Sequence, residues 1–313
     1  MSDVFTDDEG RSRSREKMQR LLRSPEVAGW LLCLPALLML VVFFLGPAIV
    51  GFRVSLYKWD GASPSMEFVG LGNYVEALSS ERFWNAMKVN WLAFVGSLLT
   101  QMPLALGLAL GLSRKGFGMK VYRSAIFAPQ VMSIAAVALL WSLLYNPYQG
   151  PINQLFRSIG LDVLATGWLG NPDTALGSLL VATAWFYFGF HMVIFMAGLA
   201  AIPKEIFEAV QLETNSWLKT LVYVTLPLLR EQILLVFVFI FAGSFGHLMG
   251  FFSLMTEGGP AGATELLGIY MSLQAFRANR YGYASAISAI ILLIVGGVLA
   301  WPALRVARDR LEY

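Results

Sequence analysis

The sequence predicts an all-α membrane protein with six transmembrane helices and both termini in the cytoplasm. Of its 313 residues 57% are hydrophobic and 14% are charged, whereas a soluble domain is about half apolar and a quarter charged. Six uncharged windows each reach the roughly 20 apolar residues that a bilayer-spanning helix needs. These windows are 29–51, 89–112, 124–146, 176–201, 232–254 and 282–302. The connections are too short for a second folded domain, which predicts one membrane domain, 29–304, between the tails 1–28 and 305–313.

The positions of the basic residues predict the orientation. Most of the 23 Lys and Arg residues lie in the N-terminal tail, in the connections after the second and fourth spans, and in the C-terminal tail. Cytoplasmic connections are enriched in Lys and Arg, so we expect both termini in the cytoplasm. The tail from Arg11 to Arg23 lacks interleaved aromatic residues and directly precedes a span, which favours an anchor at the anionic leaflet over nucleic-acid binding.

Several local features refine the spans. The first is expected to end near Gly46-Pro47, and Tyr57 and Trp59 follow as interfacial aromatic residues. It contains the single cysteine, Cys33, which we interpret as a packing residue. The fourth span is unusually aromatic between residues 185 and 190. No mid-membrane carboxylate or His/Cys cluster is present in the six windows, so no metal site is predicted.

The connection 202–230, between the fourth and fifth spans, is too polar for a membrane and too regularly patterned for a linker. Pro203 at the first helical position and Glu205 in the first turn predict a helix start. Apolar residues follow at helical spacing. Asn215 or Ser216 is expected to cap a second helix that ends at Leu226-Pro227. The residues alone leave two interpretations: a hairpin that rests on lipid, or a ridge that docks in a groove of a partner.

This connection resembles the EAA loop of permease subunits in binding-protein-dependent ABC importers, and more specifically of the carbohydrate-type permeases. The resemblance runs from Ile202-Pro203 through Glu208-Ala209 to Leu226-Pro227-Leu228-Leu229-Arg230. Further stretches match the family in the same order and at similar spacing. They are Phe68-Val69-Gly70-Leu71-Gly72-Asn73-Tyr74, Tyr122-Arg123-Ser124 with Pro129, Thr256-Glu257-Gly258-Gly259-Pro260, and Tyr281-Gly282-Tyr283-Ala284-Ser285-Ala286.

The resemblance implies a set of partners and a location. It implies a multi-pass protein of the bacterial inner (plasma) membrane that works with a second, homologous permease, two ATPase subunits and an extracytoplasmic substrate-binding protein. ATP and Mg would be bound by the ATPases, so we expect no cofactor and no catalysis in this chain. ATP-driven closure of the ATPases would pull the loops together and open the permease pair outward. The implied ATPase-coupling residues are Phe207, Glu208, Ala209, Leu212, Glu213, Thr214 and Trp217.

The turn of this loop departs from the family pattern. The family's loop reads Ala-Ala-x-x-Asp-Gly, whereas this chain has Glu213-Thr214 in the last two places. A β-branched residue resists positive φ, so Thr214 is not expected to take the left-handed conformation. We expect either Asn215 at positive φ, or a turn with negative φ throughout in which Asn215 or Ser216 caps the second helix.

The residues also bear on two other functions, an ATPase and an ion-coupled carrier. An ATPase is excluded because the nearest phosphate-loop pattern, Gly111 to Phe117, lacks the lysine beside its second glycine and follows no strand. A secondary, ion-coupled carrier is the main alternative. Such carriers place ionisable or coordinating groups at mid-membrane, and His191 and His247 are the only such side chains here apart from Tyr and Cys.

The uncharged spans predict a neutral or zwitterionic substrate. Aromatic faces and neutral hydrogen-bonding groups bind sugars, although each aromatic residue also fits simple packing or lipid contact. Trp185, Phe188 and Met192 share one helical face and Tyr187 and His191 an adjacent one, and only one face lines a pore. The sequence leaves open which sugar is carried, or whether it is a polyol phosphate. The candidate substrate-pathway residues are Trp185, Tyr187, Phe188, His191, Ser244 and His247, with Asn90 and Gln101 as further polar groups.

Overall fold

The computed structural model describes residues 25–113, 116 and 118–309, with side chains described between residues 29 and 300. The predicted basic positions from Arg11 to Arg23, with Arg114, Lys115 and Arg310, lie outside the described residues. The chain divides into two compact units, one ending at Val54 and the other beginning at Ser55.

The first unit is one long apolar helix. It consists of α2 (Pro25–Leu40), the π-helical turn η1 (Val41–Leu45) and α3 (Gly46–Val54). The prediction that it ends near Gly46-Pro47 is wrong, because the helix continues to Val54. Proline lacks an N–H and its ring presses on the carbonyl four residues earlier. The wider π turn directly before Pro47 accommodates that defect within the helix.

The second unit begins with a small cap and then a long helix. Strands β1 (Tyr57–Lys58) and β2 (Glu67–Phe68) pair antiparallel, with Lys58 opposite Glu67. Helix α4 (Gly72–Ser79) follows, and the Ser80 hydroxyl caps α5 (Glu81–Leu112) by accepting from the Phe83 N–H. Helix α5 therefore begins eight residues before the predicted window at 89.

The third predicted span, 124–146, is broken rather than continuous. It contains α6 (Met119–Phe127), the 3-10 turn η2 (Ala128–Val131) and α7 (Ile134–Leu144), with a bend of 99° between the two arms. Pro129 cannot donate a backbone hydrogen bond, and Met132 is extended. The Ser133 hydroxyl then accepts from the Ala136 N–H and starts α7 as a new helix.

Beyond α7 the chain forms a short external connection and the fourth span. The connection holds α8 (Pro151–Ser158) and the 3-10 turn η3 (Asp162–Leu164), and the span is α9 (Pro172–Ala201). Helix α9 packs along α5, and its contact face is rich in small buried residues. Close backbone approach through small residues is how helices pack in lipid, where no hydrophobic force drives them together. At Gly189 a Cβ atom would collide with the Ile126 carbonyl.

The connection 202–230 and the fifth span are both segmented. The elements in order are α10 (Lys204–Glu213), α11 (Trp217–Thr220), the π turn η4 (Leu221–Thr225), α12 (Leu226–Leu228), α13 (Arg230–Phe245) and α14 (Leu248–Met255). The predicted helix end at Leu226-Pro227 is wrong by a short distance, because the helix passes Pro227 and ends at Leu228. The predicted span 232–254 is interrupted at Gly246-His247, between α13 and α14.

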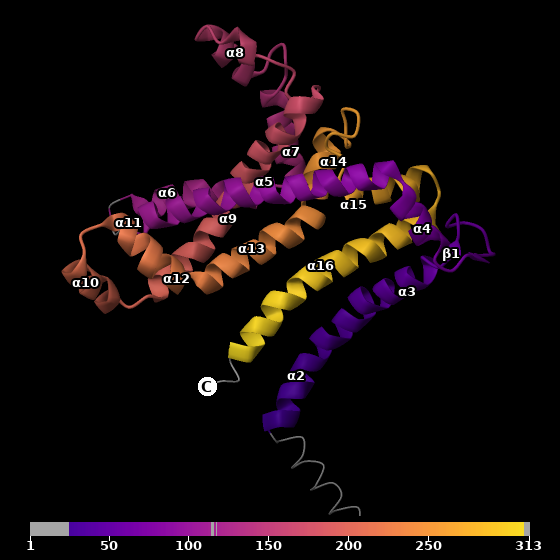
Figure 1. Ribbon diagram of the computed structural model, residues 1–313, viewed down its shortest axis with the longest axis horizontal. Helices are drawn as coiled ribbons and strands as arrows, with labels where there is room; N and C mark the ends of the chain where they lie inside the picture. The colour runs from indigo at the N-terminus through magenta and orange to yellow at the C-terminus, as the bar shows by residue number, and fades with distance from the viewer. Residues whose placement is uncertain (1–24, 114–115, 117, 310–313) are drawn as a thin grey trace, which may run out of the picture. The chain divides into compact units, whose positions relative to one another are not determined.

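The last elements are α15 (Leu267–Ser272), the π turn η5 (Leu273–Arg277) and α16 (Tyr281–Asp309). Among the described residues, four helices are long and apolar enough to cross a membrane, and two bent pairs raise that number to six. In Figure 1, α5 runs from α4 toward α6, with α10 and α11 beyond that end of the second unit. Phe94, Phe237 and Phe241 pack edge to face or stacked at the centre of the core between α5 and α13.

Candidate functional site

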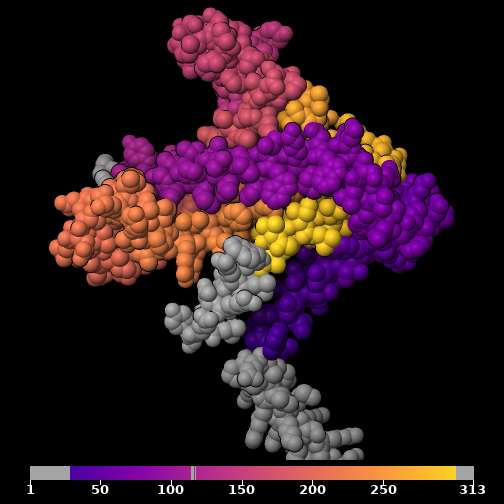
Figure 2. All heavy atoms as spheres, viewed as in Figure 1, coloured from indigo at the N-terminus to yellow at the C-terminus, as the bar shows by residue number. Residues whose placement is uncertain are grey.

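The coupling loop, defined here as residues 202–230, forms one end of the second unit. Its first helix, α10, contains no fully buried residue. Ile206, Phe207 and Val210 are half-buried, whereas Glu208 and Ala209 are exposed and Leu212 is 91% exposed. Glu208 and Leu212 are four residues apart, so they lie on the same helical face. Figure 2 shows this orange segment protruding at the end of the second unit.

The first helix of the coupling loop starts one residue later than predicted. Pro203 is the cap residue, with ψ 140°, and α10 begins at Lys204. Pro203 therefore lies just before the first helical position, a difference of one residue at a helix end. Glu205 is in the first turn, where its carboxylate faces the positive end of the helix dipole.

The turn between α10 and α11 uses negative φ throughout, as one of the two alternatives predicted. Thr214 is extended, with φ −157° and ψ 138°, and Asn215 is absent from the described non-glycine residues of positive φ. The Ser216 hydroxyl accepts from the Lys219 N–H at 3.4 Å and so caps α11. The Thr214 hydroxyl accepts from the Ser216 N–H at 3.2 Å. Hydroxyl side chains thus make the reversal for which the family uses glycine.

Trp217 follows this turn as the first residue of α11 and is 64% exposed. Leu218 beside it is 61% exposed. Together with Leu212 they give the coupling loop an apolar surface next to the carboxylates of Glu208 and Glu213. Of the seven predicted coupling residues, the structure leaves five exposed and turns Phe207 and Thr214 partly inward.

The candidate pathway residues of the fourth span mostly pack against other elements of this chain. Trp185 lies 5.9 Å from Trp141 of α7, measured between ring centroids. The Tyr187 ring lies 6.3 Å from Phe251 of α14. Phe188 is half-buried. The structure thus places Trp185 and Tyr187 at the contact between α9 and the α7–α14 pair.

His191 and His247 have opposite environments. His191 is 3% exposed, and its Nδ1 atom has no hydrogen-bond partner among the described residues. Met192 beside it is fully buried in the core. His247 is exposed at the break between α13 and α14.

Ser244 and Asn90 form a buried crosslink. The Asn90 amide donates to the Ser244 carbonyl at 2.9 Å, and its Oδ1 atom accepts from the Leu267 N–H at 3.0 Å. The Ser244 hydroxyl donates to the Ile240 carbonyl of its own helix at 2.7 Å. One buried amide therefore joins α5, α13 and the start of α15. It provides hydrogen bonds to backbone groups for which lipid offers no hydrogen-bond partner. Gln101 is also buried, at 2% exposure.

The opposite end of the unit carries a network that the sequence did not reveal. Glu265 is 3% exposed and accepts two hydrogen bonds from Arg82, at 2.9 and 2.6 Å. The Arg82 guanidinium also lies 5.3 Å from the centre of the Tyr270 ring. Tyr270 and Tyr283 are joined through their hydroxyls at 3.0 Å. The sequence gives no indication that Glu265, which follows Gly-rich residues, pairs with Arg82 at the start of a helix, because the two residues are 183 positions apart.

A second ion pair closes the same end. Arg280 donates to both oxygens of Glu76 at 2.6 Å and lies 4.4 Å from the centre of the Tyr283 ring. The loop 257–265 beside Arg82 takes positive φ at Glu257 and Ala261. We define this outer cap as residues 55–85 and 256–283, which the two ion pairs and the tyrosine pair hold together.

Comparison with known proteins identifies the family. Residues 102–306 match the family described as "Binding-protein-dependent transport system inner membrane component". The chain is 32% identical over 276 residues to the probable ABC transporter permease protein YurN of Bacillus subtilis, covering 88% of this chain and 94% of that protein. It is 30% identical over 268 residues to the multiple sugar-binding transport system permease protein MsmF of Streptococcus mutans, covering 86% and 91%.

The fold agrees with that of a solved transporter. A chain of the bacterial alginate ABC transporter, crystallised in complex with an alginate pentasaccharide-bound periplasmic protein, superposes with a TM-score of 0.74. The superposition covers 88% of this chain and 93% of that one, at 20% sequence identity, and it shows that the two chains share a fold. With the family match over most of the chain and the apolar helices, the conclusion is that this chain is a multi-pass inner-membrane protein of the binding-protein-dependent ABC transporter permease family.

Proposed function

We propose that this chain forms half of the translocation pathway of an ABC importer for a neutral or zwitterionic, sugar-like solute. In this proposal a substrate-binding protein delivers the solute, a second homologous permease completes the pathway, and two separate ATPase subunits drive it. The sugar permease MsmF supports a sugar-like substrate, whereas the solved transporter of similar fold imports alginate, an acidic polysaccharide. The uncharged spans support a solute without a fixed net charge.

The observation that carries the proposal is the exposed face of α10. Glu208, Ala209 and Leu212 lie on a helical surface that no described part of the chain covers. A largely exposed leucine beside two carboxylates suits a cleft with an apolar floor and basic or N–H groups at its rim. The small Ala209 side chain permits close approach of the partner's backbone. This face would receive the closing motion of the ATPases.

The proposed orientation places α10 and both termini in the cytoplasm. The distribution of Lys and Arg supports this orientation. The outer cap then faces the extracytoplasmic side, where the binding protein arrives. Closure of two ATPases would draw the two coupling loops together, and the permease pair would open toward the outer cap.

The pathway itself is proposed to use the fourth span. Tyr187 is half-buried and His191 is buried, and together they offer a hydroxyl and an imidazole on adjacent turns of α9. A sugar would bind by stacking on aromatic faces and by hydrogen bonds to such neutral groups. Because His191 is enclosed in the described conformation, this use requires the movement of neighbouring helices.

Reconstitution into proteoliposomes tests the proposal. The chain is incorporated with its candidate partner permease, ATPase and binding protein, and uptake of radiolabelled maltose, trehalose and glycerol 3-phosphate is measured. We expect uptake that requires both ATP and the binding protein and that survives an uncoupler. Uptake by this chain alone that collapses with the uncoupler would instead establish an ion-coupled carrier.

A further inference from the structure

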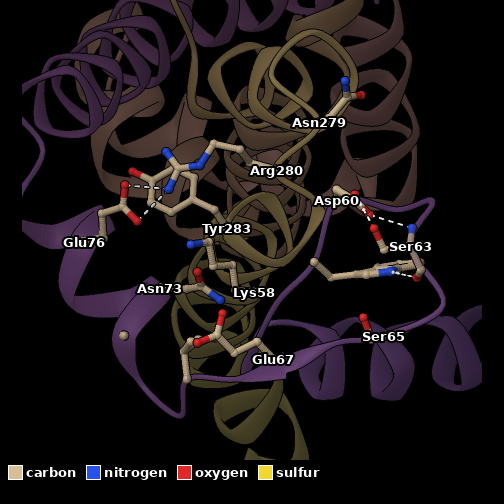
Figure 3. Close-up of a pocket in the computed structure, with 13 residues that line it drawn as sticks. Lys58, Asp60, Ser63, Ser65, Glu67, Asn73, Glu76, Asn279, Arg280 and Tyr283 are labelled. Atoms are coloured by element: carbon tan, nitrogen blue, oxygen red, sulfur yellow. Dashed lines mark hydrogen bonds and ion pairs between the residues drawn. The ribbon is translucent and has the colours of Figure 1, made fainter.

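The outer cap contains a cleft of about 630 Å³ at the end of the second unit away from α10 (Figure 3). Its walls come from three segments far apart in sequence. They are the β1–β2 segment from Lys58 to Val69, helix α4 at Asn73 and Glu76, and the residues Asn279 and Arg280 directly before α16 with Tyr283 in its first turn. Small-molecule sites in proteins have volumes of about 300–1,000 Å³, so the cleft is large enough for a saccharide unit.

The framework of the cleft is held in place by its own hydrogen bonds. Asp60 accepts from the Ala62 N–H, the Ser63 N–H and the Ser63 hydroxyl at 2.6–3.0 Å. The Trp59 indole donates to the Ser63 carbonyl at 2.9 Å. Buried Asn73 donates to the carbonyls of Ser55 and Tyr57, at 2.8 and 2.9 Å. These bonds fix the walls before any ligand arrives, which lowers the ordering cost of binding.

Four polar side chains of the cleft form no hydrogen bond or ion pair with the described residues, namely those of Lys58, Ser65, Glu67 and Asn279. Lys58 and Glu67 face each other in the strand register, yet no ion pair joins them. Lys58 supplies an ammonium group with three donor protons, Glu67 supplies a carboxylate acceptor, and Asn279 supplies an amide that both donates and accepts.

The charge balance indicates what such a set binds. Glu76 neutralises Arg280, and the three donors around Asp60 occupy that carboxylate. The donors around Asp60 carry no charge, so the two cations of the lining, Lys58 and Arg280, face three carboxylates, those of Asp60, Glu67 and Glu76. The cleft therefore has a net charge of −1, which disfavours an anion. Vicinal hydroxyls both donate and accept, and they can bridge an ammonium and a carboxylate at once. The half-buried ring of Trp59 also lines the cleft, and such rings pack against the C–H faces of sugars.

We propose that this cleft is a binding site for a neutral saccharide on the outer cap, separate from the pathway at α9. The chemical class rests on the proposed function, whereas the cleft and its unpaired groups do not. A solute bound here would lie at the extracytoplasmic end before it enters the pathway, close to the ion pair of Arg280, directly before α16.

Saturation-transfer NMR on the complete importer in nanodiscs, without binding protein and without nucleotide, tests this site. Maltose and glucose are the probes, and glucose 6-phosphate is the charged counterpart. We expect the two neutral sugars to bind at least about ten-fold more tightly than the phosphate. Glu67→Ala and Lys58→Ala should each weaken maltose binding by about ten-fold, the loss typical of one hydrogen bond to a charged group.

Two matched variants complete the experiment. Glu81→Ala removes an exposed carboxylate at the same end that does not line the cleft, and it should leave maltose binding unchanged. Tyr187→Ala alters the proposed pathway at α9, and the maltose signal that remains in this variant reports binding at the cleft of the outer cap. Both cleft residues are exposed, so the variants are expected to assemble with the ATPases at the wild-type level, which co-purification checks.

Several results would overturn the site. Absence of sugar binding would do so, as would equal binding of glucose 6-phosphate. Maltose binding that persists in Glu67→Ala and Lys58→Ala but is lost in Tyr187→Ala would locate the sugar in the α9 pathway instead. Weakened capture of the binding protein by the cleft variants, with unchanged sugar binding, would identify a protein-docking surface. ATP-driven uptake by the wild-type importer is measured separately, so failure of the cleft remains distinct from failure of the proposed function.

Discussion

The two ends of the second unit stabilise themselves in different ways. In the coupling loop, the side-chain hydrogen bonds of Thr214, Ser216 and Thr220 join positions two to four residues apart. In the outer cap, the ion pairs of Glu265 with Arg82 and of Glu76 with Arg280 join positions 183 and 204 residues apart. The cap is thus held by contacts between distant parts of the chain, whereas the loop is ordered locally. Both ends expose apolar side chains, among them Leu212 and Trp217 in the loop and Phe68 and Phe276 in the cap, so the difference lies in how each end is stabilised and not in which end has an uncovered surface.

The largest effect is expected from reversing the charge on α10. Glu208→Lys should lower transport at least about ten-fold while ATP hydrolysis continues, because it places a cation where the proposed docking requires a carboxylate. Uptake and ATP hydrolysis are measured in the same proteoliposomes. Glu81→Lys makes the same reversal at the outer end and should keep the two coupled. Normal transport by Glu208→Lys would remove α10 from the coupling role.

A several-fold loss of transport is expected from substitutions in α9, which lies between the two ends of the second unit. Tyr187→Ala or His191→Ala should reduce the uptake rate while co-purification with the ATPases stays at the wild-type level, since neither residue is near α10 in sequence or contact. Tyr187→Phe retains the ring and isolates the contribution of the hydroxyl. If both alanine variants transport at the wild-type rate, the solute does not use this face of α9.

The ion pairs of the outer cap should differ in their contribution to stability. Arg82→Met leaves the carboxylate of buried Glu265 without its partner and should lower the free energy of unfolding by about 2 kcal/mol, less than for a fully buried pair because Arg82 is half-exposed. Arg277→Met is the matched control, since Arg277 and Glu257 are both about 70% exposed, and should cost under about 1 kcal/mol. Thermal unfolding in detergent compares them, and equal losses would contradict the importance of burial.

A smaller effect is expected at the turn of the coupling loop. Thr214 has negative φ. The glycine of the family pattern would therefore relieve no backbone strain at this position. Thr214→Gly should lower stability by about 0.5–1 kcal/mol through the entropy of the unfolded chain and the lost hydroxyl contact to Ser216. A clear gain in melting temperature would mean that the native turn needs positive φ after all.

The smallest effect concerns pH and the outer cap. The hydrogen bonds from Ser63, and then from the Ala62 N–H, lower the pKa of Asp60 from 3.8 to about 2. A carboxyl group with a lowered pKa stabilises the fold above its unfolded pKa, and that contribution disappears as the pH falls through the folded value. The melting difference between wild type and Asp60→Asn should therefore stay constant from pH 7 to about pH 4.5 and shrink between about pH 4 and pH 2. A decrease that begins at pH 6 would contradict this assignment.

The spans illustrate how far sequence patterns reach. The windows for the second, fourth and sixth spans correspond to continuous helices, although α5 and α9 begin earlier, at Glu81 and Pro172. The windows for the third and fifth spans contain breaks at residues 128–133 and at Gly246-His247. An apolar window records only the length of chain that tolerates lipid, so it gives no information on a bend that neighbouring helices stabilise.

The sequence by itself determined the apolar segments and the polar coupling loop and reduced the turn at residues 214–216 to two alternatives, because hydropathy and capping chemistry act over a few neighbouring residues. Only the tertiary structure decided which partner Glu265 finds, which atoms Asn90 bridges, and that Lys58, Glu67 and Asn279 meet in one cleft. It also decided that His191 is buried while His247 is exposed. These arrangements depend on contacts between helices far apart in the chain, and such contacts leave no periodic signal in the sequence.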